Sequence, residues 1–293
     1  MEKTKRIGVV LSSGGGPGVF AHTGFLLALE KMGIKPAAIA GCSAGALVGG
    51  VYASGTSIKN WAEALKTIKP QAYWQPDTPW QFLWNMTVQK GRGYTGFSDT
   101  KGAVEVITDH LKARTFEACS MPFYSLAINL THEKKTLFSS GELAPRIMAS
   151  AAIPAFYRPM EIDGQLYSDG AVIGMTPTEA ICCKHHLDAV IIHYIAPEHP
   201  GPTGLEKAMN SSWTIVEIIQ RLLHHEKPWY LSGEPLGITH CRCGCKAPFY
   251  VIEAELDEME WPPEKGGQKI LKSVFRQTRK LLEPHRTSLI VSG

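Results

Sequence analysis

Two strand-turn-helix units follow one another at the start of this 293-residue chain. In the first, apolar residues 7–11 precede a glycine-rich turn, and residues 19–32 carry apolar side chains at helical spacing up to Gly33. In the second, the apolar residues 37–40 and another glycine-rich turn lead into the small residues 46–53. Consecutive units of this kind predict an α/β fold with a mainly parallel sheet covered by helices.

The rest of the chain continues the alternation of strands and helices. Further strands are expected at residues 123–129, 136–138, 189–195 and 249–256, and a tight hairpin on an Asp-Gly turn is expected at residues 162–167. Further helices are expected at residues 103–113, 144–152, 177–186, 205–225 and 268–282. Residues 74–97 differ, because tryptophans and prolines alternate there without a period, and we expect an irregular excursion. No repeat is visible, so we expect a single domain over residues 1–293, in which residues 6–177 carry the motifs and residues 178–293 complete the domain.

Composition limits the class of protein. Hydrophobic residues make up 44% and charged residues 19% of the chain, which is typical of a globular protein. The net charge is only +3 and the basic residues are dispersed, which argues against a nucleic acid partner. No apolar run approaches the ~18 to 20 residues needed to cross a bilayer. The seven cysteines, an odd number, favour a reducing compartment, so we expect a cytoplasmic protein with peripheral membrane contact at most.

The first chemical motif is Gly41-Cys42-Ser43-Ala44-Gly45, which matches the pattern G-x-S-x-G. Its small residues allow a strand to turn sharply into a helix, with the serine at the apex. The amino end of the following helix then directs its N–H groups and positive dipole toward the serine. The flanking strand and helix are present, so the sequence predicts Ser43 as a nucleophile, with Gly41 and Gly45 as the supporting glycines.

The second motif is the triplet Gly14, Gly15 and Gly16, also between a strand and a helix. Successive glycine N–H groups can converge on one anion, such as the oxyanion of an acyl-transfer intermediate. A nucleotide-binding loop is the alternative, but Val19 stands where G-x-G-x-x-G needs its last glycine, and no Gly-Lys-Ser/Thr follows. The triplet therefore predicts an anion-binding loop of another kind.

The third motif is Asp169-Gly170-Ala171, at the end of a predicted strand. An isolated Asp-Gly is usually only a turn. With the first two motifs, however, it forms a set that resembles the patatin-like phospholipase family over about residues 6–177. Further pieces of the resemblance are His22, Gly24, residues 149–154, residues 157–159, Asp163-Gly164 and Pro177.

The resemblance implies a catalytic dyad, in which Ser43 is the nucleophile and Asp169 takes its proton, while Gly14, Gly15 and Gly16 form the oxyanion hole. It also implies a three-layer α/β/α fold and a phospholipid or other lipid ester as substrate, with no cofactor. A carboxylate with a pKa raised by burial would suit this role. Chain-length and head-group specificity and the oligomeric state stay open.

Two alternatives remain. The family commonly has Arg or Lys where this chain has Gly18, and glycine where it has Val19, so a catalytically weak lipid-binding protein is the first. The second is an α/β-hydrolase with a Ser-His-Asp triad, which needs a histidine after the acid. The histidines that follow Asp169 are His185, His186, His193, His199, His224, His225, His240 and His285.

The segment His240-Cys241-Arg242-Cys243-Gly244-Cys245 suggests zinc binding or a labile disulfide. Structural zinc sites normally combine two cysteine pairs, and we identify no second pair in the sequence. Plain loop thiols are therefore the favoured interpretation, and we expect no metal.

Two further segments each have two readings. The aromatic residues between Trp74 and Trp84 suit either a lid or membrane-inserting loop, or a small satellite core. The basic amphipathic helix at 268–282 suits either a membrane surface or, as we favour, packing of its apolar side against the core.

Overall fold

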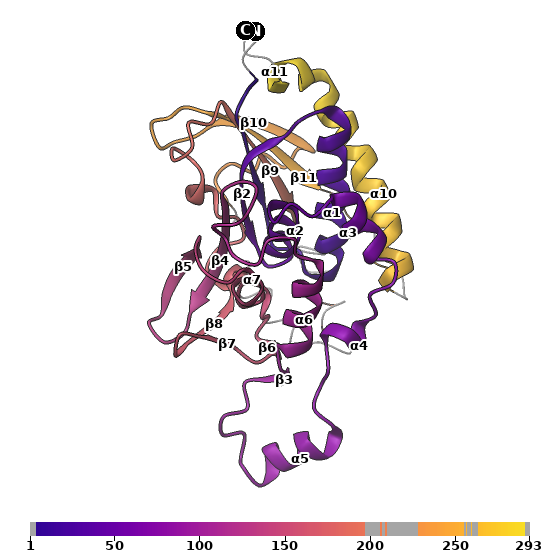
Figure 1. The fold of residues 1–293 in the computed structure, drawn as a ribbon, viewed down its shortest axis with the longest axis vertical. Coiled ribbons are helices and arrows are strands. Elements are labelled where there is room, and N and C mark those ends of the chain that lie inside the picture. Colours follow the sequence, from indigo (N-terminus) through magenta and orange to yellow (C-terminus); the bar gives the residue numbers. More distant parts are fainter. Residues whose placement is uncertain are drawn as a thin grey trace.

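The computed structural model describes residues 4–196, 206, 209, 228–254, 256, 259 and 263–290. Within this part of the chain, the main sheet has nine strands in the order β10-β11-β9-β1-β2-β4-β8-β7, and β5 also pairs with β4 (Figure 1). Its strands are β1 (Ile7–Leu11), β2 (Pro36–Cys42), β4 (Phe123–Asn129), β5 (Lys134–Phe138), β7 (Met160–Ile162), β8 (Gln165–Asp169), β9 (Ala189–Ile195), β10 (Leu236–His240) and β11 (Pro248–Ala254). A separate two-stranded sheet joins β3 (Gly96–Ser98) and β6 (Ala155–Tyr157).

The centre of the main sheet is parallel and its borders are antiparallel. Strand β1 pairs in parallel with β2 and β9, while β4 and β11 extend the parallel part on either side. The antiparallel strands β10, β5, β7 and β8 lie outside this part. The mainly parallel sheet is thus confirmed, and β9 and β11 join it from the C-terminal part of the chain.

Alternate side chains of the strands enter cores on opposite faces of the sheet. The helices are α1 (Gly15–Met32), α2 (Ala44–Ala53), α3 (Ile58–Ala64), α4 (Pro70–Tyr73), α5 (Pro79–Thr87), α6 (Lys101–His110), α7 (Leu143–Ala151), α10 (Pro263–Leu282) and α11 (Arg286–Ile290), with 3₁₀ turns η1 (Gly170–Val172), η2 (Thr178–Ala180) and η3 (Glu283–His285). Val9 and Leu11 enter the core beneath α1, α2 and α10, whereas Val10 packs with Ala180 of η2 on the opposite face. Helical elements therefore cover both faces, as the predicted three-layer fold requires.

Helix α10 runs alongside α1 in the same helical layer (Figure 1). A Cβ on Gly24 would lie 2.3 Å from the backbone oxygen of Leu271, so only glycine permits this approach. Ile270 and Val274 of α10 are buried in the main core. The core-facing interpretation of residues 268–282 is therefore confirmed. At the amino end of β1, the Lys5 N–H donates a 3.1 Å hydrogen bond to the Ile290 carbonyl.

Two predictions about secondary structure are wrong. The expected helix at 177–186 is only the short turn η2, since Cys183 and His186 have positive φ angles that end helical geometry. The excursion at 74–97 is not irregular throughout, because α5 forms within it. Thr78 caps this helix in a reciprocal capping box with Gln81.

The expected helix at 205–225 lies outside the described residues. Across the part of the chain that the structure describes, no helix is both long and apolar enough to cross a membrane.

Candidate active site

Ser43 lies at a sharp turn between β2 and α2. Its backbone has φ 53° and ψ −118°, a conformation that costs a non-glycine residue about 1–3 kcal/mol. Both supporting glycines are required because neighbouring backbone lies too close for a side chain. A Cβ on Gly41 would lie 2.4 Å from the Gly45 oxygen, and a Cβ on Gly45 would lie 2.4 Å from the Leu11 oxygen. The predicted strained turn is therefore present, with Ser43 as the N-cap of α2.

The structure brings Ser43 and Asp169 together. The Ser43 hydroxyl donates a 2.6 Å hydrogen bond to Oδ2 of Asp169. The other carboxylate oxygen, Oδ1, accepts a 2.8 Å hydrogen bond from the Ala171 N–H. Asp169 ends β8, which pairs with β4 beside the carboxyl end of β2, and this sheet register places the two residues together. Gly170 is needed because a Cβ there would lie 2.3 Å from the Leu126 oxygen.

The environment of Asp169 disfavours its charge. The residue is 3% exposed, and burial raises its pKa to about 6, although the hydrogen bonds from Ser43 and Ala171 act in the opposite direction. The carboxylate is therefore mostly ionised at neutral pH, yet it is a stronger base than an exposed aspartate. That is the property required to accept a proton from a serine hydroxyl.

Ser150 fixes the backbone of Ser43. The Ser43 N–H donates a 2.9 Å hydrogen bond to Ser150 Oγ, and the Ser150 hydroxyl donates in turn to the Leu126 carbonyl. Ser150 lies on α7 and is fully buried. Its residue type alone indicates no role in the site, although Ser150 falls within residues 149–154, one of the pieces of the family resemblance.

The glycine triplet forms the amino end of α1, beside this turn. Gly14 is the N-cap, and Gly15 begins the helix with a positive φ of 57°. The first N–H groups of a helix have no acceptor within it and are available to an anion. A Cβ on Gly18 would lie 3.0 Å from the Ala44 Cβ, so the first turn of α1 contacts the residue that follows Ser43.

The residues of this site fall within a segment that matches a known protein family. The sequence model of the patatin-like phospholipase family matches residues 10–181, a span that includes the glycine triplet, Ser43 and Asp169. The chain belongs to the patatin-like phospholipase family.

Relatives of this patatin-like chain include much longer proteins. Lysophospholipase NTE1 of Cryptococcus neoformans var. neoformans is 27% identical over 210 residues, which cover 71% of this chain and 12% of that protein. An uncharacterized NTE family protein of Mycobacterium bovis is 30% identical over 178 residues, covering 60% of this chain and 45% of that protein. The chain thus spans less than half the length of either relative.

A similar fold occurs in human GIVD cytosolic phospholipase A2, solved in complex with methyl gamma-linolenyl fluorophosphonate. The TM-score is 0.53 at 12% sequence identity, and the match covers 97% of this chain and 59% of that one. At this identity the likeness concerns the fold alone.

Beneath the glycine loop of the patatin-like site lies a buried histidine pair. His22 Nε2 lies 2.8 Å from the Ser12 carbonyl, which can only accept, so this nitrogen carries the hydrogen. His22 Nδ1 then accepts from His193 Nδ1 at 2.8 Å. Burial lowers the pKa of His22 to about 3 and that of His193 well below its usual value, so the pair is neutral. Its hydrogen bonds fix the carbonyl that precedes the loop.

Histidine does not contact the acid of this site within the described residues. The hydrogen bonds to the Asp169 carboxylate come from Ser43 and Ala171. His193 is paired with His22, and His185 contacts Tyr124. His199, His224 and His225 lie outside the described residues.

The aromatic excursion is connected to the site through the small sheet. Ala152 accepts the Asp169 N–H at 3.1 Å, and β6, which begins at Ala155, pairs with β3 at the end of the excursion. The start of the excursion is held by an Arg158–Asp77 ion pair, in which Nη2 of Arg158 donates to both carboxylate oxygens, at 2.7 Å to Oδ1 and 2.5 Å to Oδ2.

Helix α5 itself projects away from the rest of the molecule (Figure 1). Its Trp80 is 79% exposed and its Trp84 57% exposed, while Phe82 makes ring contacts with Tyr94 and Phe97. A small aromatic cluster thus supports an exposed apolar surface, and the role of that surface as a lid or membrane-inserting segment stays a prediction.

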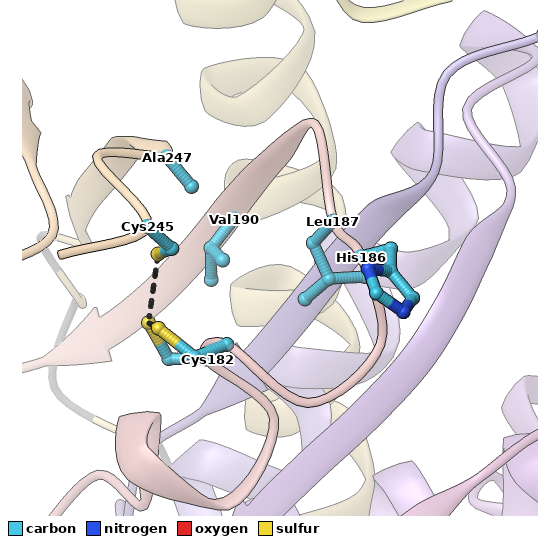
Figure 2. A pocket seen from close by; sticks show the side chains of 7 residues that line it. Cys182, His186, Leu187, Val190, Cys245 and Ala247 are labelled. Atoms are coloured by element: carbon cyan, nitrogen blue, oxygen red, sulfur yellow. Dashed lines mark hydrogen bonds between the residues drawn. The ribbon is translucent and has the colours of Figure 1, made fainter. Parts of the chain in front are cut away.

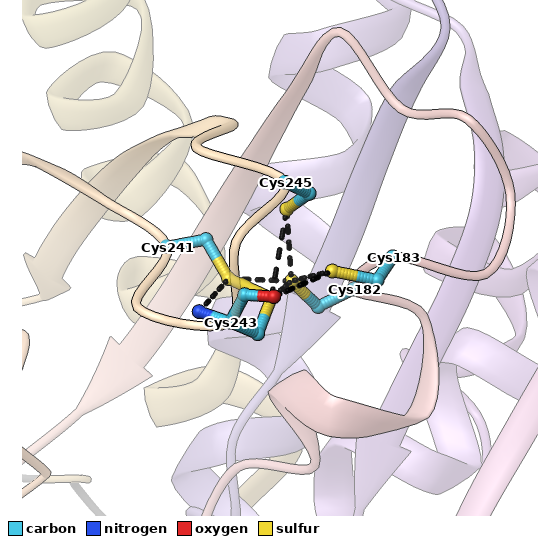
Figure 3. Close-up of side chains that lie close together, drawn as sticks. All are labelled: Cys182, Cys183, Cys241, Cys243 and Cys245. Atoms are coloured by element: carbon cyan, nitrogen blue, oxygen red, sulfur yellow. Dashed lines mark hydrogen bonds between the residues drawn. A yellow bond between two sulfur atoms is a disulfide. The ribbon is translucent and has the colours of Figure 1, made fainter.

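The cysteine loop lies elsewhere and has more neighbours than expected. Cys182 and Cys183 meet the loop cysteines Cys241, Cys243 and Cys245, and the five sulfurs lie within 4.8 Å of one another (Figure 3). The prediction that no second cysteine pair accompanies this loop is therefore wrong. The turn after η2 supplies the second pair, Cys182 and Cys183. Because a helix was predicted at residues 177–186, the meeting of these two cysteines with the loop was not expected.

Proposed function

We propose that this chain is a serine hydrolase of lipid acyl esters, with Ser43 as nucleophile and Asp169 as base. The observation that carries the proposal is the 2.6 Å hydrogen bond from the Ser43 hydroxyl to the Asp169 carboxylate, at a strained turn beside the glycine loop. Membership of the patatin-like phospholipase family supports it.

The reaction proceeds in two steps. As Ser43 Oγ attacks the ester carbonyl, its proton moves to Oδ2 of Asp169, and the tetrahedral oxyanion is held by the N–H groups of Gly14, Gly15 and Gly16. The ester C–O bond then breaks, and the departing alcohol takes the proton from Asp169. Water, deprotonated by the same carboxylate, attacks the acyl-Ser43 ester and releases a fatty acid, while the proton returns to Ser43.

We propose that the substrates are phospholipids, with lysophospholipids preferred over their diacyl counterparts. The Cryptococcus relative is named a lysophospholipase, which favours a single-chain substrate. Hydrolysis of a lipid panel that pairs each lysophospholipid with its diacyl counterpart tests this choice, and preference for the diacyl lipid would contradict it.

The two alternatives are weighed by the same geometry. A Ser-His-Asp triad places histidine between the acid and the serine, whereas here Asp169 contacts Ser43 directly. The weak lipid-binding alternative was based on Gly18, where the family commonly has Arg or Lys. In this chain, however, the absence of a side chain at Gly18 allows the first turn of α1 to pack closely against Ala44, next to Ser43. Both points favour the Ser-Asp enzyme.

Covalent labelling tests the proposal. A fluorophosphonate probe should form an adduct on Ser43, located by mass spectrometry of the peptide, and Ser43→Ala should remain unlabelled. Ser288→Ala, at an exposed serine on α11 away from the site, is a control that keeps the nucleophile and should still be labelled. Absence of an adduct on folded wild-type protein would support the lipid-binding alternative.

We further propose that the protein contacts membranes peripherally through α5 and acts in the cytoplasm. The exposed Trp80 and Trp84 suit the interfacial region of a bilayer, where tryptophan is enriched. Free thiols such as Cys42 and Cys119 suit a reducing compartment.

A further inference from the structure

The cysteine cluster lies at the end of the sheet opposite to Ser43. Cys182 and Cys183 precede the amino end of β9, and residues 241–245 connect β10 to the amino end of β11. Since β9, β11, β1 and β2 are parallel, these amino ends lie far from the carboxyl end of β2 that carries Ser43. The cluster is therefore separate from the proposed hydrolase site.

The spacing of the sulfurs suits one metal ion. Cys182 Sγ lies 3.6 Å from Cys245, 3.1 Å from Cys243 and 2.8 Å from Cys241. Cys182 and Cys183 lie 3.9 Å apart, and Cys243 and Cys245 lie 3.6 Å apart. A tetrahedral zinc with Zn–S bonds of about 2.3 Å separates its sulfurs by about 3.8 Å. Small side-chain rotations would thus place four sulfurs around one ion.

The surroundings of the cluster favour negatively charged sulfur. Residues 182–187 and 240–247 contain Lys184, Arg242 and Lys246 but no acidic residue, which suits the net negative charge of a tetrathiolate site. The Cys243 N–H donates to Cys241 Sγ at 3.4 Å, the kind of outer contact that orients a ligand. Within the described residues, the set contains only cysteines, a soft donor set typical of zinc or iron.

A cavity of about 260 Å³ adjoins the sulfurs. Figure 2 shows Cys182 and Cys245 on one side of it and Leu187 and His186 on the other. Cys183, Cys243 and Cys245 are exposed, so an ion can reach the cluster from solvent.

We propose that four of these five cysteines bind one zinc ion, which fastens the β10–β11 hairpin to the connection between η2 and β9. Binding forms four Zn–S bonds and releases the protons of four thiols. The ion is structural, because its ligands fill the tetrahedron. It holds β10, the edge strand of the sheet, to a part of the chain about 60 residues earlier.

A disulfide is the competing state. The structure joins Cys241 and Cys243, which leaves Cys182, Cys183 and Cys245 as thiols. Five sulfurs cannot all pair, and thiols attract one another only weakly, so one disulfide does not account for the convergence of the other three. The zinc-bound state requires Cys241 and Cys243 in reduced form.

The test is the metal content of the whole chain, purified under reducing conditions without a polyhistidine tag. We expect about one zinc per chain, and a cobalt-substituted sample with intense thiolate-to-cobalt absorption and tetrahedral d–d bands. The double variant Cys182→Ser/Cys243→Ser leaves three sulfurs and should lose the zinc. Cys119→Ser, at a half-buried cysteine outside the set, should keep it.

Other results would overturn the zinc site. These are folded wild-type protein without metal, a Cys241–Cys243 disulfide located by peptide mass mapping under the same reducing conditions, iron in place of zinc, and zinc retained by the double variant. If the double variant does not fold, the cobalt spectrum of the wild type and a fall of its melting temperature on chelation decide the question.

Discussion

The Ser43 hydroxyl and the Asp169 carboxylate are joined by a 2.6 Å hydrogen bond across 126 positions of sequence. The second carboxylate oxygen is held by the Ala171 N–H, so the carboxylate is fixed at both atoms. In this geometry only Oδ2 bonds to the serine, so the hydroxyl proton of Ser43 can pass directly to that oxygen.

Replacing Asp169 by asparagine should lower kcat/KM for ester hydrolysis about 10² to 10⁴-fold, because the amide keeps the shape but cannot accept the proton. The measurement is hydrolysis of a lysophospholipid together with circular dichroism to verify folding. Near wild-type turnover by a folded Asp169→Asn protein would rule out the dyad and return attention to a histidine-based triad.

The rate should also depend on pH in a defined direction. Burial raises the pKa of Asp169 to about 6, and the base works only when ionised, so kcat/KM should rise as pH increases through about 6 and level off above it. At pH 5 it should be about tenfold below the plateau. The measurement is a profile of kcat/KM from pH 4.5 to 8, about the range over which this group titrates. A profile that is flat down to pH 4.5 would show that this carboxyl is not the base.

Ser150→Ala should reduce both stability and turnover. The substitution leaves the buried Ser43 N–H without its acceptor, at a cost of about 1–3 kcal/mol in the free energy of unfolding. Because the strained Ser43 backbone is then less fixed, kcat should fall more than KM rises. Ser125→Ala is the control, since Ser125 is equally buried but bonds to the Arg146 carbonyl. Equal losses of kcat in both variants would indicate a general packing effect.

Replacing both Trp80 and Trp84 by serine should weaken binding to phospholipid vesicles at least about tenfold, because these side chains supply exposed apolar area on α5. Vesicle co-sedimentation measures this. Hydrolysis of a water-soluble short-chain ester should be unchanged, and so should vesicle binding by Ile238→Ser, a substitution of another exposed apolar residue on the distant strand β10. Undiminished binding by the tryptophan variant would place membrane contact elsewhere.

Much of the fold could be predicted from the sequence because its central strands are largely buried. The predicted bounds of β1, β4 and β9 agree with the structure, since each is an apolar, β-branched or aromatic run between polar or glycine-rich turns. The pairing of Ser43 with Asp169 was implied by the resemblance to the patatin-like phospholipase family, which rests on the order of three motifs that are not specific alone.

What the sequence did not reveal depends on contacts between distant segments. Cys182 and Cys241 are 59 positions apart, and a single sequence contains no signal that they meet. Ser150 acts through the backbone of Ser43, a role that its residue type does not indicate. Helix α5 had a readable signal, the capping pair Thr78 and Gln81 with Pro79 at the first position, but the surrounding prolines suggested irregular structure.

The hydrogen bond between Lys5 and Ile290 has a practical consequence. Lys5 and Ile290 thus lie side by side near the amino end of β1, whereas Ser43 follows the carboxyl end of the parallel strand β2. A tether or fusion partner attached at that point would extend away from α5 (Figure 1). The protein could then be anchored to a sensor chip while its tryptophans remain free to meet a supported bilayer.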